Sequence, residues 1–181
     1  MRTTKLFAFM IGLLAVQWGC TSQPGKVSFE SRDEPLMVFL VRHGEKVDQS
    51  RDPELSIAGE IRADVLATTL LNAHIEYIHS SDYIRTRNTV APIAKTLGLK
   101  VELYDPDNLP ALVDRLIDQR GRHLVVGHSS TTLRMVELLG GGYYPPIDGA
   151  DEYDRLYIVT IGPDGEVSSV QLSYGASYLK K

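Results

Sequence analysis

Three short polar segments of the sequence combine arginine, histidine and hydroxyl side chains. They are Arg42-His43-Gly44-Glu45, Ser80-Ser81-Asp82 followed by Arg85, and Gly127-His128-Ser129-Ser130. Guanidinium groups match phosphate oxygens with pairs of parallel hydrogen bonds, and helix N-termini add backbone N–H donors. If the three segments meet in space, we expect them to form a binding site for a phosphate group.

A histidine in such a site is able to do more than bind. Positive charge from neighbouring guanidinium groups lowers the pKa of an imidazole, which keeps the ring neutral and nucleophilic near neutral pH. The second histidine is able to donate a hydrogen bond to the charge that develops on a transferring phosphoryl group. Attack on phosphorus by one imidazole would produce a phosphohistidine, which water later hydrolyses.

The elements that must position these segments are predicted by two alternating apolar patterns that begin at Leu36. A continuous apolar run over 36–41 is typical of a strand buried on both faces, and further strands are expected at 75–79, 100–104 and 123–126. Four helices are expected. Ser56 caps the first, whose apolar stripe is Ala58, Ile61, Val65, Leu66 and Leu70. The second covers 83–97, ends at Gly98 and is kinked or started by Pro92, the third has Pro110 in its first turn, and the fourth covers 131–139. A terminal hairpin is expected from 155–161 and 166–174.

Strands interleaved with helices predict an α/β fold, a three-layer α/β/α sandwich with a mostly parallel central sheet. In open sheets of this kind the ligand crevice lies beyond the carboxyl ends of the strands. The three polar segments directly follow the first, second and fourth expected strands. The fold should therefore bring two arginines and two histidines to one edge of the sheet.

In this order, the segments resemble the motifs of the histidine phosphatase superfamily, whose fold is called phosphoglycerate mutase-like. The motifs are Arg42-His43-Gly44, the run Ser80-Ser81-x-x-x-Arg85-x-x-x-Thr89, and Val126-Gly127-His128-Ser129. Pro53-Glu54-Leu55-Ser56-x-x-Gly59 is also similar to the family's segment that leads into its first helix. The resemblance covers roughly residues 36–174.

The resemblance implies a role for each matching residue. His43 is implied to be the nucleophile that becomes phosphorylated, and Arg42, Arg85 and His128 to complete the phosphate pocket. The backbone around Gly44 is implied to approach closely and to help set the tautomer of His43. The resemblance implies no metal and no organic cofactor, and a small phosphorylated substrate.

A phosphatase is favoured over a mutase because the chain lacks the insertions that cap the site in the mutases it resembles. An open pocket lets water reach the phosphohistidine. In size, the chain is similar to the small bacterial phosphohistidine phosphatases of the family. The substrate is therefore expected to be a phosphomonoester or a phosphohistidine.

The proton donor for the leaving oxygen stays open at this point. The turn after the third expected strand offers Asp105 and Asp107, and its position favours Asp105. Glu45 is a third candidate because it lies close to His43 in the sequence. A water molecule would be the alternative to a carboxyl group.

Three other functions compete with this interpretation. Gly127-His128-Ser129-Ser130-Thr131 nearly matches the nucleophile elbow of serine hydrolases, but no histidine follows Ser129, whereas that fold places its histidine last. A zinc site is disfavoured because Arg42 and Arg85 would repel a cation. A protein that binds phosphorylated ligands without turnover is the third alternative.

The N-terminal residues predict a targeting signal rather than a folded element. Arg2 and Lys5 precede an apolar run over 6–16, and Gly19 and Cys20 follow, which is the pattern of a secretory signal. The run is too short for a membrane-spanning helix, and the position of Cys20 resembles the lipidation site of bacterial lipoproteins. We expect a signal peptide over 1–19, a lipid-anchored tether over 20–34 and a histidine phosphatase domain over 35–181, held in the bacterial cell envelope on the periplasmic side or the outer surface.

Composition limits the remaining possibilities. The chain has 181 residues and a formal charge of −4, which fits one domain and gives no overall positive field that would attract nucleic acid. A single cysteine excludes an intramolecular disulfide framework and a cysteine-based zinc site. The oligomeric state is not predicted by any of these features.

Overall fold

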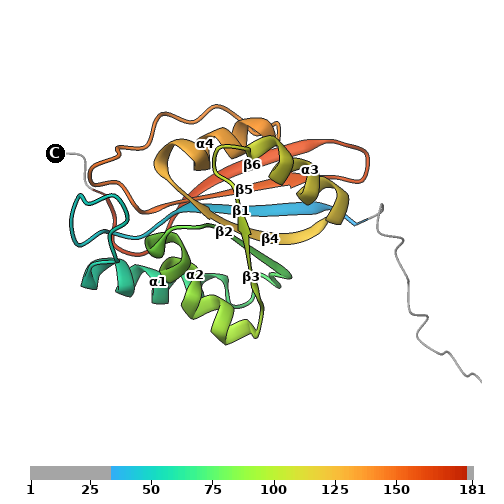
Figure 1. The fold of residues 1–181 in the computed structure, drawn as a ribbon. Helices are drawn as coiled ribbons and strands as arrows, with labels where there is room; N and C mark the ends of the chain where they lie inside the picture. The colour runs from blue at the N-terminus through green and yellow to red at the C-terminus, as the bar shows by residue number, and fades with distance from the viewer. Residues whose placement is uncertain (1–33, 179–181) are drawn as a thin grey trace, which may run out of the picture.

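The alternating apolar patterns build one sheet with helices on both faces in the computed structural model, which describes residues 34–178 (Figure 1). The strands are β1 (Leu36–Arg42), β2 (Tyr77–Ser81), β3 (Val101–Tyr104), β4 (Gly121–Gly127), β5 (Arg155–Ile161) and β6 (Val167–Ser173). The helices are α1 (Ile57–Leu70), α2 (Ile84–Leu97), α3 (Leu109–Gln119) and α4 (Ser129–Leu138). The expected three-layer α/β/α fold is confirmed.

The sheet has the strand order β3-β2-β4-β1-β5-β6. The first four strands pair in parallel, and β5 pairs antiparallel to both β1 and β6 as the expected hairpin. β1 and β4 lie side by side in register, with Arg42 opposite Gly127. The carboxyl ends of these two central strands therefore meet at one edge of the sheet.

Side chains of β1 alternate between two buried layers, as expected for a strand covered on both faces. Val38 and Leu40 pack with residues of α3 and α4, whereas Phe39 and Val41 pack with residues of α1 and α2. All four side chains are buried. Burial on both faces fixes the height of the strand end, which is where the polar segment begins.

The end of β2 corrects one expectation. β2 covers 77–81 rather than 75–79, so Ser80 and Ser81 belong to the strand and are fully buried. The pairing of Ser80 with Val126 of β4 extends the strand to this point. Ser81 thereby lies level with the end of β4 rather than in a loop beyond the sheet.

The buried face of α1 corrects another. Ser56 caps the helix as predicted, but Ile61 of the expected stripe is 59% exposed while its neighbour Arg62 is buried. The side chain of Arg62 hydrogen-bonds to Glu45 and to the carbonyl of Tyr174, which turns that face of the helix toward the sheet. The residues that the helix buries are Gly59, Arg62, Ala63, Leu66, Ala67 and Leu70.

The helix α2 starts at Ile84 and runs through Pro92 to Leu97, so the proline lies inside the helix and does not mark its start. Gly98 ends it in the left-handed conformation, as predicted.

The predicted signal peptide, Cys20 and nearly all of the predicted tether lie outside the described residues. Within 34–178, no helix combines the length and the apolar character that a membrane span requires.

Candidate active site

His43 and His128 lie next to each other at the carboxyl edge of the sheet. His43 directly follows β1, His128 directly follows β4, and the backbone N–H of His43 donates to the carbonyl of Gly127 at 3.0 Å. The two imidazole rings meet edge to face with centroids 5.5 Å apart. The pairing of β1 with β4 is thus what brings together two residues that are far apart in the sequence.

The hydrogen bond of His43 determines which ring nitrogen is free. Nδ1 lies 2.8 Å from the carbonyl of Gly44, and because a carbonyl only accepts, Nδ1 carries the proton. Burial lowers the pKa of His43 to about 3, and positive charge from Arg42 acts in the same direction. The ring is therefore neutral at neutral pH, with an unprotonated Nε2 that has the lone pair of a nucleophile.

Two contacts orient His128, one in which a ring nitrogen accepts a hydrogen bond and one in which the other ring nitrogen donates one. Arg85 Nη2 lies 3.3 Å from Nδ1, and since a guanidinium only donates, the proton of the ring is on Nε2, 3.1 Å from Ser81 Oγ. Burial lowers the pKa of His128 to about 4, and positive charge from Arg85 adds to this shift. Both histidines of the pair are thus neutral in the folded protein.

Two arginines begin helix α2, and only Arg85 turns toward the histidines. Its side chain is 12% exposed, and its guanidinium lies 4.4 Å from the ring centre of Tyr83, which itself contacts His128. The side chain of Arg87 is 42% exposed and pairs with Asp82. The two side chains therefore lie on different faces of the helix, with Arg85, the residue predicted to bind phosphate, toward the histidines and Arg87 away from them.

Arg42 is held by a loop that the sequence analysis did not single out. Its Nη1 and Nη2 donate to the carbonyls of Asp148, Gly149 and Glu152 at 2.6–2.9 Å, and its guanidinium lies 3.9 Å from the ring centre of Tyr153. Tyr153 also faces the ring of His43, at 5.9 Å between centroids. No pattern in the sequence indicates these contacts, which join positions more than 100 residues apart.

Two buried donors in this arrangement have no protein partner. Among the side chains of residues 34–178, Nε of Arg42 and Nε of Arg85 are buried without a hydrogen bond. A buried polar group left unpaired costs about 1–3 kcal/mol, so such groups in a folded protein call for an explanation. Both guanidinium groups lie close enough to His43 for their charge to lower its pKa, so this charge favours an anion bound next to the free Nε2.

Gly44 and Gly59 form a close backbone contact beside the nucleophile. A Cβ on Gly44 would lie 2.9 Å from the carbonyl oxygen of Gly59, and a Cβ on Gly59 would lie 2.3 Å from that of Glu45. The N–H of Gly44 donates to Thr89 Oγ1 at 3.0 Å. Residues of three quoted motifs therefore meet here and hold the chain directly after His43.

None of the three candidate proton donors, Asp105, Asp107 and Glu45, forms a hydrogen bond with His43 or His128 within the described residues. The carboxylate of Asp105 accepts from the N–H of Asp107 at 2.9 Å within an exposed turn. Glu45 accepts three hydrogen bonds from Arg62 at 2.7–3.0 Å, so its carboxylate is held by that side chain.

The competing chemistries find no support in the described contacts. Within 34–178, Ser129 has no hydrogen bond to a histidine, although it begins α4 directly after His128. The same residues contain no cluster of three histidine, cysteine, aspartate or glutamate side chains with the spacing of a metal site.

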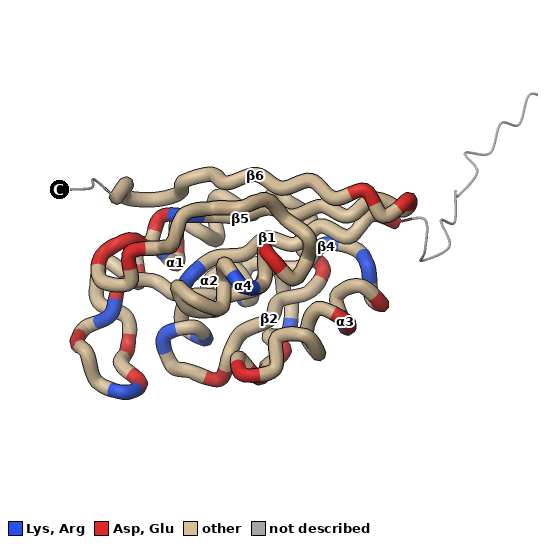
Figure 2. The backbone as a smooth tube through the Cα atoms, turned by 90° about the horizontal axis from the view of Figure 1, so that it is seen from above, with Lys and Arg blue, Asp and Glu red and all other residues tan. Residues whose placement is uncertain are grey.

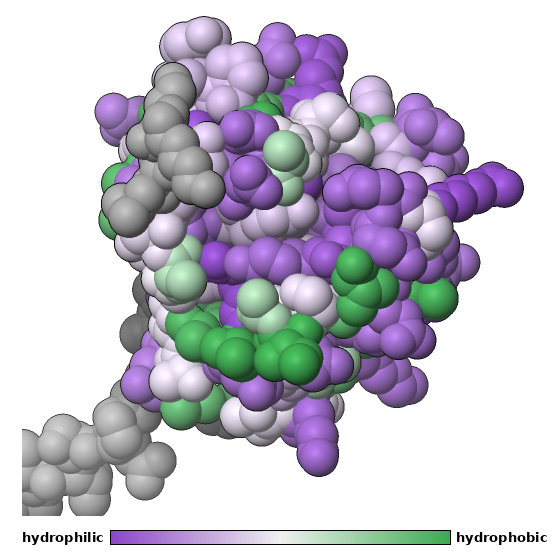
Figure 3. Space-filling view, turned by 90° about the vertical axis from the view of Figure 1, so that its left-hand side faces the viewer, coloured by the Kyte–Doolittle hydropathy of each residue, from purple (hydrophilic) through white to green (hydrophobic). Residues whose placement is uncertain are grey.

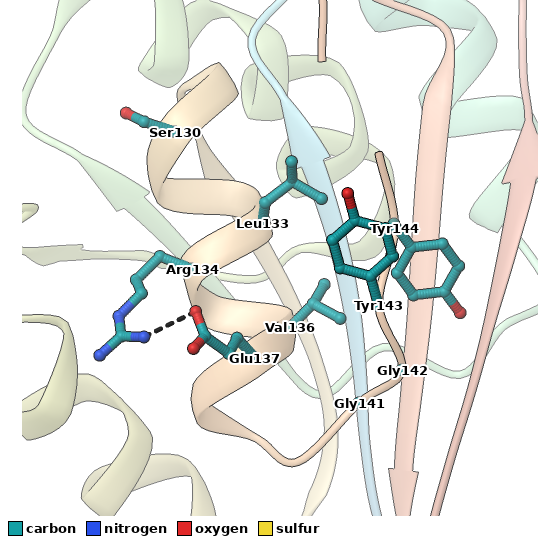
Figure 4. A pocket seen from close by; sticks show the side chains of 9 residues that line it. All are labelled: Ser130, Leu133, Arg134, Val136, Glu137, Gly141, Gly142, Tyr143 and Tyr144. Atoms are coloured by element: carbon teal, nitrogen blue, oxygen red, sulfur yellow. Dashed lines mark ion pairs between the residues drawn. The ribbon is translucent and has the colours of Figure 1, made fainter. Parts of the chain in front are cut away.

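Two hollows lie near this end of the molecule. Figure 3 looks onto the carboxyl edge of the sheet, which is mostly hydrophilic, with hydrophobic side chains gathered below, on the side of α1 and α2. A cavity of about 520 Å³ adjoins the histidines through Tyr153, and a second of about 500 Å³ runs along α4 beside residues 141–144 (Figure 4). The first is lined by Glu45, Arg62, Asp148, Asp151, Tyr153, Ala176, Ser177 and Tyr178.

Comparisons with known proteins agree with this geometry. Residues 38–106 match the sequence model of the family described as "Histidine phosphatase superfamily (branch 1)". A protein of Yersinia enterocolitica named "Probable phosphoglycerate mutase GpmB" is 42% identical over 78 residues, which are 39% of this chain and 36% of that protein. The chain therefore matches only about a third of the length of this relative.

Solved structures share the fold over most of the chain. The protein histidine phosphatase SixA, solved with tungstate, superposes with a TM-score of 0.62 at 22% identity and covers 76% of this chain and 97% of its own. A phosphoglycerate mutase from Bacillus anthracis superposes with a TM-score of 0.61 at 16% identity, over 78% of this chain and 94% of its own. The sequence match to the histidine phosphatase superfamily thus covers 38–106, and the solved structures show that the chain has a phosphoglycerate mutase-like fold.

Proposed function

We propose that this protein is a phosphatase that works through a covalent phosphohistidine on His43. The observation that carries the proposal is the free Nε2 of a neutral His43 beside two buried guanidinium Nε donors that lack protein partners. A nucleophile and unpaired cationic donors at one place are what phosphoryl transfer requires.

The reaction has two steps. In the first, the lone pair of His43 Nε2 attacks phosphorus, the bond from phosphorus to the leaving oxygen breaks, and that oxygen takes a proton from a carboxyl group or from water. Arg42 and Arg85 stabilise the charge on the phosphoryl oxygens, and His128 does so when its Nε2–H turns from Ser81 Oγ to one of these oxygens. In the second, water attacks phosphorus and gives a proton back to the group that protonated the leaving oxygen, and the P–N bond breaks. Inorganic phosphate leaves and neutral His43 is regenerated.

The lining of the neighbouring cavity supports a preference among substrates. Glu45, Asp148 and Asp151 face it, and its one cationic side chain, Arg62, is already paired with Glu45. A leaving group in this cavity meets mainly negative charge, which repels a carboxylate. Phosphoethanolamine should therefore be hydrolysed faster than 3-phosphoglycerate, and the opposite order would show that the leaving group lies elsewhere.

The first test is hydrolysis of p-nitrophenyl phosphate by the chain from Pro35 onward. Activity should be blocked by vanadate, abolished by His43→Ala and unaffected by EDTA, and acid-labile labelling should disappear in the variant. Inhibition by EDTA would favour a metal-dependent reaction. A wild-type protein whose melting temperature rises with phosphate but which turns nothing over would favour the alternative of a non-catalytic binding protein.

We also propose that a lipid on Cys20 attaches the protein to the cell envelope of a bacterium. The support is the sequence pattern of residues 1–20. β1 begins at the edge of the sheet opposite to His43, so an anchor on the N-terminal side would hold the site away from the membrane. Cys20→Ser should release the full chain from membranes and stop its labelling by fatty acid, and unchanged membrane association would exclude this anchor.

A further inference from the structure

The loop between β1 and α1 places one carboxylate against the start of α2. Acidic and basic residues follow each other closely along this loop (Figure 2), and one of them, Asp52, reaches the neighbouring helix. Its Oδ1 accepts from the backbone N–H of Ile84 at 3.0 Å and from Arg85 Nη1 at 3.2 Å. A single oxygen thus contacts both the first residue of α2 and the side chain that follows.

The first of these contacts supplies a helix cap from a distance. Tyr83 occupies the N-cap position of α2 and makes no side-chain hydrogen bond to the helix. Asp52 lies more than 30 residues earlier and satisfies one of the free N–H groups instead. Its negative charge also lies at the positive end of the helix dipole.

The second contact determines the direction of a flexible side chain. With Nη1 on Asp52 and Nη2 on Nδ1 of His128, two points of the planar guanidinium of Arg85 are fixed. The stacking of the guanidinium on Tyr83 fixes its plane. Nη1 also donates to the carbonyl of Arg51 at 3.4 Å, and of the N–H groups that remain, that of Nε is buried without a partner.

We propose that Asp52 is a positioning residue, which orients Arg85 so that its unpaired Nε donor faces the phosphoryl group. This inference rests on the proposed function for the identity of the ligand. Asp52 itself makes no hydrogen bond to His43 or to His128. Its main effect reaches the site through Arg85, because ordering this side chain in advance removes an entropy cost from binding. The negative charge of Asp52 also acts on His128 directly and opposes the lowering of its pKa.

The same helix start offers a matched control. Asp82 pairs with Arg87, as Asp52 pairs with Arg85, but the side chains of Asp82 and Arg87 are 67% and 42% exposed and contact neither histidine. Any general effect of losing one Asp–Arg pair near α2 should be the same for Asp52 with Arg85 and for Asp82 with Arg87. Only the pair that orients the phosphate ligand should change binding.

The experiment measures the Kd of inorganic phosphate by calorimetry, kcat and KM for p-nitrophenyl phosphate, and the melting temperature. Asp52→Asn keeps an oxygen that accepts from Ile84 but loses the charge that holds Arg85, so its melting temperature should stay close to wild type. Its Kd and KM should rise about tenfold with a smaller change in kcat. Asp52→Ala should show at least the same rise together with a lower melting temperature, and Asp82→Asn should change Kd by less than about twofold.

A double-mutant cycle separates positioning from a structural role. If Asp52 acts through Arg85, then Asp52→Asn should leave Kd unchanged in the Arg85→Ala background. Equal effects of Asp52→Asn with and without Arg85, or an unchanged Kd and KM in Asp52→Asn, would overturn the inference. Wild-type protein that binds phosphate but turns nothing over would overturn only the proposed phosphatase, because Kd still tests Asp52, and wild-type protein that binds no phosphate would overturn both.

Discussion

One pair of histidines lies within the sheet of this protein and another lies at its edge, and only the second has the properties of a reactive site. His79 and His123 are fully buried with ring centroids 5.3 Å apart, close to the 5.5 Å between His43 and His128. Burial lowers the pKa in both pairs, to about 3 for His79 as for His43. Burial and a lowered pKa therefore do not distinguish a catalytic histidine from a structural one.

The partners of the ring nitrogens make the difference. His79 Nε2 lies 3.0 Å from His123 Nδ1, and His123 Nε2 lies 2.6 Å from the carbonyl of Arg120, so the pair forms one chain of hydrogen bonds. The fourth nitrogen, His79 Nδ1, has no hydrogen-bond partner among residues 34–178 but is buried inside the fold. Tyr77 stacks on the ring of His123. These histidines lie within β2 and β4, whereas His43 and His128 come after strand ends, beside Arg42 and Arg85. A free nitrogen next to cationic donors is what marks the site.

The largest expected effect comes from replacing one histidine of each pair. His43→Ala should reduce turnover of p-nitrophenyl phosphate by about 10³-fold or more, because it removes the lone pair that is proposed to attack phosphorus. His79→Phe should keep turnover within about threefold of wild type at a temperature where it stays folded. Measuring both at the same fraction folded removes the stability effect, and equal losses would erase the distinction between the pairs.

The next effect concerns the cationic donors. Arg85→Ala should weaken phosphate binding by about 1.5–3 kcal/mol, the range for hydrogen bonds to charged groups, which calorimetry resolves as a rise in Kd. Arg87→Ala should leave Kd nearly unchanged because its pair with Asp82 is exposed. The reverse ranking would mean that the other face of α2 binds the ligand.

A smaller effect, on the pH dependence of stability, tests the neutral burial that the two pairs share. A histidine has a pKa of about 6.5 in the unfolded chain and about 3 at His79, so the unfolded state binds more protons between these values. The free energy of unfolding should fall as pH drops below about 6.5, by up to about 1.4 kcal/mol per pH unit for each such histidine. Urea titrations should show a shallower fall for His79→Phe than for wild type, and an identical slope would contradict neutral burial of His79.

The smallest expected effect is that of pH on kcat/KM, which the two histidines of the site should leave flat near neutral pH. The pKa of His43 is about 3 and that of His128 about 4, so both rings stay neutral from pH 8 down to about 5. Corrected for ionisation of the substrate, kcat/KM should show no inflection from either histidine in this range. An inflection near pH 6.5 that His128→Gln removes would show that His128 titrates normally.

Much of the fold follows from local patterns in the sequence. The run over 36–41, the cap at Ser56 and the stop at Gly98 each depend on residues close together in the chain, and each appears where it was predicted. The positions of His43, Arg85 and His128 after strands or in the next helical turn were equally predictable, because parallel strands end at one edge. The roles of these residues remain predictions.

Only the tertiary structure decided what surrounds them. The end of β2 at Ser81, the buried Arg62, the carbonyls that hold Arg42 and the contact of Asp52 with Arg85 all join segments distant in sequence. The difference between His123 and His128, five residues apart, arises in the same way, from which side chains neighbouring strands and loops place beside each ring. Local patterns specify an element and its ends, whereas the partners of a buried polar atom are determined only when separate elements pack together.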